Sequence, residues 1–114
     1  MIAVIFEVVP FVGERHRYLD LAGELRERLE ATDGFLSVER FESLTTRGKL
    51  LSLSFWRDEE AVRRWRETEE HRAAQATGRG GVFAAYRLRV AQVLRDYGLE
   101  DRAEAPEDSR GRHG

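Results

Sequence analysis

The residues best suited to chemistry lie close together, between positions 51 and 79. This stretch contains both tryptophans of the chain, Trp56 and Trp65, and the histidine His71 within a segment expected to pack. An imidazole with an ordinary pKa of about 6.5 can accept or donate a proton near neutral pH. Arg72 follows directly, and a guanidinium group can hold an anion. We therefore take His71 and Arg72 as candidate catalytic residues, a base and an anion-stabilising group.

The helical spacing around Trp65 creates a conflict between these two residues. At about 100° per residue, Arg72 lies about 20° from Trp65 around the helix, and His71 about 120° away. A regular helix would aim the guanidinium at the core, where an unpaired charge is very costly. Arg72 could extend to solvent, it could pair with an acid such as Glu7, or the helix could bend near Thr68. A bend would turn His71 inward and create a pocket between sheet and helix, suited to a small aromatic ligand.

Plain structural roles compete with this hypothesis. Trp65 could be an ordinary core residue, His71 a surface or capping histidine, and Arg72 one half of an ion pair. The spacing of the three histidines matches no metal site, so no metal is predicted. The glycine-rich segment 78–81 follows a helix instead of opening one, which argues against a phosphate-binding loop.

Composition bounds the class of protein. The chain has 114 residues, with 41% hydrophobic and 35% charged residues and a net charge of −2, which indicates one domain without a basic patch for nucleic acid. It has no cysteine, so disulfides and thiolate sites are excluded. No apolar run approaches the roughly 18 residues of a membrane span, and no secretory signal is recognised. We expect a cytoplasmic protein that binds neither membranes nor nucleic acid.

Hydrophobic periodicity predicts an α+β fold. Apolar residues alternate, or fill both faces, in four candidate strands, and they recur at helical spacing in two candidate helices. The strands are expected at residues 2–9, 35–45, 50–56 and 86–97, and the helices at 14–31 and from 58 to about 77. This βαββαβ order is ferredoxin-like: an antiparallel four-stranded sheet with two helices on one face. We assign residues 1–98 to this domain and expect 99–114, including His113, to form a disordered acidic tail.

The strands carry more apolar side chains than two helices can cover. Residues 2–9 are apolar on both faces, and residues 50–56 place leucines and Phe55 on one face and Trp56 on the other. A second apolar sheet face needs a cover, and a second copy of a short chain can supply one. The sequence therefore predicts a homodimer in which two sheets meet as an α/β barrel.

Three segments of the chain resemble a known family: FWRDEEAVRRW, EHRAAQATGR and YRLRVAQVLRDYG. They are similar to the antibiotic biosynthesis monooxygenase superfamily of dimeric α/β barrels, in particular its small stand-alone bacterial members. The likeness covers about residues 2–98. It implies the ferredoxin-like fold already inferred, and it favours an enzyme of the monooxygenase type.

The resemblance implies two chemistries for one pocket. Some relatives oxygenate phenolic or quinol substrates without metal or flavin, and this is the activity we favour, with no cofactor. There His71 would be the base and Arg72 or Arg79 would stabilise the anion. The pocket walls would be aromatic: Trp65, Phe6, Phe55 and Tyr86.

Other relatives bind or degrade haem, through an Asn in the first strand, a helix Trp and a His ten residues after it. Trp65 matches the Trp, but Gln75 stands at the His position and Glu7 near the Asn position. Haem binding or degradation is therefore the alternative, with His71 as a neighbouring ligand. A third hypothesis is a non-catalytic dimer that binds a small ligand or acts in stress.

Overall fold

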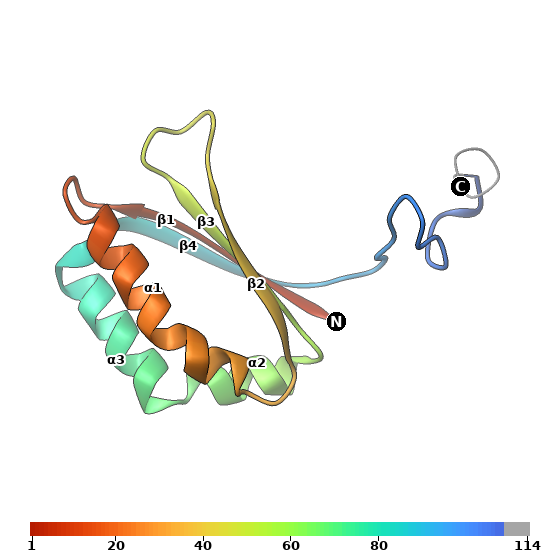
Figure 1. Cartoon of the computed structure of the whole chain (residues 1–114), viewed down its shortest axis with the longest axis horizontal. Coiled ribbons are helices and arrows are strands. Elements are labelled where there is room, and N and C mark those ends of the chain that lie inside the picture. The colour runs from red at the N-terminus through yellow and green to blue at the C-terminus, as the bar shows by residue number, and fades with distance from the viewer. Residues whose placement is uncertain (109–114) are drawn as a thin grey trace.

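The computed structural model describes residues 1–108, apart from the side chains of Glu69 and Glu70 (Figure 1). The order of its elements confirms the predicted βαββαβ arrangement, with the second helix divided in two. The elements are β1 (Ile2–Pro10), α1 (Arg15–Glu30), β2 (Phe35–Glu42), β3 (Leu50–Trp56), α2 (Glu59–Arg66), α3 (Glu69–Thr77), the π-helical turn η1 (Gly78–Val82) and β4 (Phe83–Gln92).

The four strands form one antiparallel sheet in the order β2-β3-β1-β4. The apolar strand β1 is central, as its two apolar faces predict. All three helices pack on the same face of the sheet (Figure 1). This two-layer α+β arrangement is the expected ferredoxin-like fold.

Helix α1 packs on the sheet through buried residues at helical spacing. Tyr18, Ala22 and Leu29 are its buried residues and face the sheet. The chain leaves the helix at a turn in which Gly34 has a φ of 89°. A side chain at this φ would be strained, so the turn requires a glycine.

The second predicted helix breaks at Thr68, as one of the three alternatives proposed. Each of the two resulting helices has a cap at its start: Asp58 Oδ1 accepts a hydrogen bond from the Ala61 N–H at 2.9 Å in α2, and at the break Thr68 Oγ1 accepts one from the His71 N–H at 3.2 Å in α3. The Thr68 hydroxyl also donates to the Trp65 carbonyl at 2.8 Å. Each short helix thus begins at its own capping residue, and each follows a different direction over the sheet.

Two strand boundaries differ from the predictions. Strand β2 ends at Glu42 instead of residue 45, because the Ser43 hydroxyl accepts hydrogen bonds from the N–H groups of Thr45 and Thr46, at 3.3 and 3.0 Å, and forms a turn. Strand β4 occupies Phe83–Gln92 instead of 86–97. It ends where its partner β1 begins, because Gln92 pairs with Ile2 and no further strand lies beside it.

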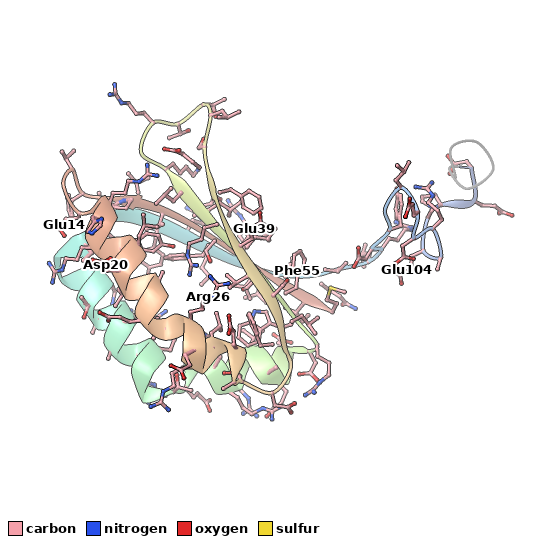
Figure 2. The ribbon with its side chains drawn as sticks, viewed as in Figure 1. Glu14, Asp20, Arg26, Glu39, Phe55 and Glu104 are labelled. Atoms are coloured by element: carbon pink, nitrogen blue, oxygen red, sulfur yellow. The ribbon has the colours of Figure 1, made fainter. Side chains whose placement is uncertain are left out.

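After β4 the chain extends away from the sheet (Figure 1). Residues 93–108 make local contacts: the Arg102 guanidinium lies over the Tyr97 ring at 5.1 Å and donates to the Gly98 carbonyl. Glu104 lies in this extension, far from the helices (Figure 2). Residues 109–114 of the expected tail, with His113, lie outside the described residues.

Candidate functional site

The hydrophobic core consists of two clusters with a cavity bordering both. One cluster contains Val8, Tyr18, Leu50 and Val82; the other contains Leu29, Trp56, Ala61 and Trp65. The cavity holds about 220 Å³ and is lined by residues of the sheet and of all three helices. Because a cavity of roughly 150 Å³ can hold benzene, this volume suits a ligand of one or two rings.

Two cross-strand rows of the sheet form the floor of the cavity. They are Val38–Ser54–Val4–Val90 and Arg40–Ser52–Phe6–Leu88, written in the order β2, β3, β1, β4. The polar members all come from β2 and β3, and the members from β1 and β4 are apolar. The floor therefore has a polar end and an apolar end.

The cavity opens to solvent along the edge strand β4. Tyr86, Leu88 and Val90 line it, yet they remain 49%, 44% and 46% exposed. Large apolar side chains exposed together are typical of a binding surface. A small molecule can therefore reach the cavity beside β4.

The break at Thr68 turns His71 into this cavity. The His71 ring packs edge-on against Trp65, with ring centroids 5.4 Å apart and an interplanar angle of 62°. Burial lowers the pKa of His71 below its ordinary 6.5, and the main-chain carbonyl of Arg66 partly opposes this effect. The imidazole is therefore mainly neutral at pH 7. Its Nδ1 is buried without a hydrogen-bond partner among the described residues.

One face of α3 and the turn η1 that follows it supply the polar wall. His71 and Gln75 of α3 and Arg79 of η1 recur at intervals of four residues and all line the cavity, with Ala74 beside them. Ala74 leaves room over the sheet because its side chain is a single methyl group. The wall thus presents an imidazole, an amide and a guanidinium in line.

Five of the predicted site residues come together in the cavity: His71, Trp65, Phe6, Arg79 and Tyr86. Two do not, and these placements correct the expectation.

Arg72 is exposed on α3 and absent from the cavity lining, because the break rotates it outward as His71 turns in. Phe55 lies on the opposite sheet face, because its neighbours Ser54 and Trp56 line the cavity and side chains alternate along a strand. Glu7 is also on that face, where it pairs with Lys49 and Arg89 instead of Arg72.

Several polar side chains line the cavity without having been predicted as site residues. Arg26 reaches from α1 toward the sheet (Figure 2), and Arg40 and Ser52 lie side by side on β2 and β3. The alternation of β2 could have revealed Arg40, because it shares a face with Val38. Arg66, at the end of α2, also lines the cavity.

No group of three or more His, Asp or Glu residues that could hold a metal ion occurs within residues 1–108. Within the same range, no helix is both long and apolar enough to cross a membrane.

The fold and the site define a class: a ferredoxin-like α+β domain with a small-molecule cavity between sheet and helices. Comparison with known families agrees, because the profile of the antibiotic biosynthesis monooxygenase family matches residues 1–77. The chain belongs to this family, as its sequence motifs implied.

Two curated relatives share substantial identity with the chain. A jasmonate monooxygenase from Pyricularia oryzae is 50% identical over 93 residues, which cover 82% of this chain but only 43% of that enzyme. The Bacillus subtilis protein YqjZ is 39% identical over 77 residues, covering 64% of this chain and 66% of its own length. The chain thus spans less than half of the Pyricularia enzyme.

Solved structures share the fold at low identity. Protein Rv0793 of Mycobacterium tuberculosis has a TM-score of 0.76 and 21% identity, with 85% of this chain and 98% of that chain covered. A candidate antibiotic biosynthesis monooxygenase from Deinococcus radiodurans has a TM-score of 0.77 and 12% identity, with 87% and 98% covered.

Proposed function

We propose that the protein catalyses the cofactor-independent oxygenation of a small phenolic or quinol-type ring compound in the cavity. The observation that carries this proposal is the position of His71: a neutral imidazole inside an apolar cavity, in contact with Trp65. Membership of the monooxygenase family and the name of the Pyricularia relative, a jasmonate monooxygenase, support an oxygenase acting on a small organic molecule.

The chemistry needs no external reductant when the substrate supplies the electrons. With 1-naphthol as the example, His71 accepts the phenol proton, and the electron-rich naphtholate transfers electrons to O₂. The ring carbon then loses hydrogen and gains one oxygen atom, which gives 1,4-naphthoquinone, and the second oxygen atom leaves as water. Substrate and O₂ together contain all the atoms and electrons of quinone and water.

The cavity would assist each stage of this reaction. The apolar members of the floor, Phe6 and Leu88, exclude water from the ring and thereby strengthen electrostatic contacts. Arg79, in the turn η1 eight residues after His71, also lines the cavity and would stabilise the naphtholate. Arg79 takes the role for which Arg72 was also considered, because Arg72 faces away from the cavity.

The test is oxygen uptake with 1-naphthol, with quinone formation followed by absorbance. General-base catalysis is typically worth about 10²–10⁴-fold, so His71→Gln should lower kcat at least about 100-fold. His16→Gln is the control, because His16 is exposed on α1. Unchanged turnover in His71→Gln would refute His71 as the base, and no turnover by the wild type would refute this substrate class.

Haem binding is the second candidate, because His71 lies in the same cavity. The rest of the haem-degrading pattern fits poorly: Glu7 lies on the other sheet face, and Gln75 offers an amide instead of an imidazole. Titration with hemin separates the two functions. A Soret shift that is lost in His71→Ala would favour haem ligation, whereas no shift would exclude it.

We propose in addition that two copies pair through the open sheet face. Phe41, Leu53 and Phe55 share this face, which no helix covers, and Phe41 is 43% exposed. The carboxylate of Glu7 on this face is already paired with two cations, so its charge is neutralised before burial. Light scattering on Phe55→Glu should show a monomer, and an unchanged mass in this variant would refute the interface.

A further inference from the structure

The cavity carries positive groups without matching acids. Its lining includes Arg26, Arg40, Arg66 and Arg79, and no Asp or Glu is among the lining residues found in the described part of the chain. Among the ion pairs between described side chains, Arg26 is the one cavity arginine that takes part, with Glu30 on the same helix at 2.9 Å. A concave site lined by one sign of charge attracts ligands of the opposite sign.

Arg40 is the least exposed of the four arginines that line the cavity. It lies on β2 in the row with Ser52 and Phe6, so its side chain faces the helices. It is partly buried, and its Nε is enclosed without a hydrogen-bond partner within residues 1–108. A buried donor without a partner is costly, and a ligand that supplies an acceptor removes that cost. The geometry of a guanidinium suits the two oxygens of a carboxylate.

The remaining polar groups of the floor favour the same ligand. Ser52 neighbours Arg40 across the strand pair and offers a hydroxyl as a further donor. Phe6 and Leu88 continue the same row and offer only apolar surface. His71 lines the cavity from α3. A ligand lying along the row would therefore have an anionic end at β2 and an apolar ring toward β4.

We propose that the substrates of this cavity are amphipathic carboxylates, and that Arg40 determines this specificity by binding the carboxylate. This inference deepens the proposed oxygenase function and rests on the same cavity. It adds a second polar contact remote from the reacting carbon, which would fix the ring relative to His71. Arg40 is thus a substrate-binding residue that the aromatic walls alone do not reveal.

Isothermal titration calorimetry with a matched pair of ligands tests the proposal. The probes are 2-naphthoate and 2-naphthamide, which have the same ring and nearly the same shape but differ in charge. The wild type should bind the carboxylate about ten- to hundredfold more tightly, the range expected of hydrogen bonds to a charged group. Equal affinity for the two probes, or no binding of naphthoate, would overturn the proposal.

Three variants locate the effect. Arg40→Met keeps the side-chain length and should weaken naphthoate about tenfold or more while leaving naphthamide unchanged. Arg40→Lys keeps the charge without the fork and should fall between the two. Arg47→Met removes the same charge from an exposed position outside the cavity and should change nothing. Equal losses in Arg40→Met and Arg47→Met would show a general charge effect and refute the assignment to Arg40.

The binding and turnover experiments can refute the anion site and the oxygenase independently of each other. Naphthoate affinity is measured without any reaction, so an absence of oxygen uptake both with 1-naphthol and with its carboxylate 1-hydroxy-2-naphthoate would refute the oxygenase and leave the anion site intact. Oxygen uptake with 1-naphthol together with equal affinity for naphthoate and naphthamide would refute the anion site and leave the oxygenase intact. Circular dichroism of each variant establishes that it is folded before its affinity is compared.

Discussion

Replacing Gly34 by alanine should destabilise the protein through two separate effects. The φ of Gly34 is 89°, and a left-handed backbone costs an L-residue about 1–2 kcal/mol. A Cβ at this position would also lie 2.5 Å from the Cβ of Ala61, which is fully buried on α2. Carbon atoms pack at about 3.5–4.0 Å, so α2 must move by about 1 Å. Such overpacking costs about 1–3 kcal/mol, which gives a total of about 2–5 kcal/mol.

Gly48→Ala is the matched control for this substitution. Gly48 has a φ of 80°, but nothing lies within 4 Å of a Cβ built on it. Only the backbone cost of about 1–2 kcal/mol should remain. Urea denaturation measures both free energies of unfolding, and the two should differ by about 1–3 kcal/mol. Equal losses in the two variants would refute the contact with Ala61 as a cause.

Gly34→Ala should also change the shape of the cavity. Ala61 and Trp65 lie one turn apart on the buried face of α2, so a shift of Ala61 displaces Trp65 from His71. The first turn of α2 cannot relax freely, because Arg57 binds Asp33 through both nitrogens at 3.2 Å and its N–H donates to the Gly34 carbonyl at 2.7 Å. Gly34→Ala should therefore weaken ligand binding, and Gly48→Ala should not. Unchanged affinity in Gly34→Ala would refute this coupling.

Three further outcomes are expected. Thr68→Ala removes the cap of α3 and should cost about 1 kcal/mol in urea denaturation, whereas Thr77→Ala, which removes a hydroxyl bound only to its own helix, should cost less. Burial lowers the pKa of His71 in the folded state, so His71 takes up a proton at a higher pH in the unfolded chain than in the folded one. The free energy of unfolding should therefore fall as the pH drops below about 6.5, and it should fall less steeply in His71→Gln. A pH profile with equal slopes would contradict this. Hydrogen bonds from Lys49 and Arg89 lower the pKa of Glu7. Its contribution to stability is therefore full above its ordinary pKa of 4.5 and is lost as the pH falls through the lowered pKa, so Glu7→Gln should lower the free energy of unfolding more at pH 7 than at pH 3.

Much of the fold could be predicted because local patterns agree with one another. The strands alternate, α1 has its apolar spacing, and Gly34 marks the turn after it. The helical wheel left three alternatives for Arg72, and a bend of the helix near Thr68 was one of them. A repeated signal would have decided it: Asp58-Glu59-Glu60 opens α2, and Thr68-Glu69-Glu70 repeats the same capping pattern ten residues later.

The cavity was harder to predict because its lining depends on tertiary packing. Phe55 was predicted as a wall of the pocket, but its neighbour Trp56 lines the cavity, and neighbours on a strand face opposite sides of the sheet. The placement of Arg72 followed from the break, which changes the helical phase. Arg40 was not predicted as a cavity residue, because it joins His71 in one lining only when the sheet packs against α3, which is distant in sequence.

The cavity between the two core clusters also couples ligand binding to folding. A ligand that fills it completes the apolar interior and binds only the native chain. At a concentration of 100 times its Kd, such a ligand stabilises the native state by about 2.7 kcal/mol. For a domain of about this size, each kcal/mol raises Tm by roughly 4–8 °C. A thermal-shift screen should therefore rank small molecules by affinity for this cavity, including compounds that bind without reacting.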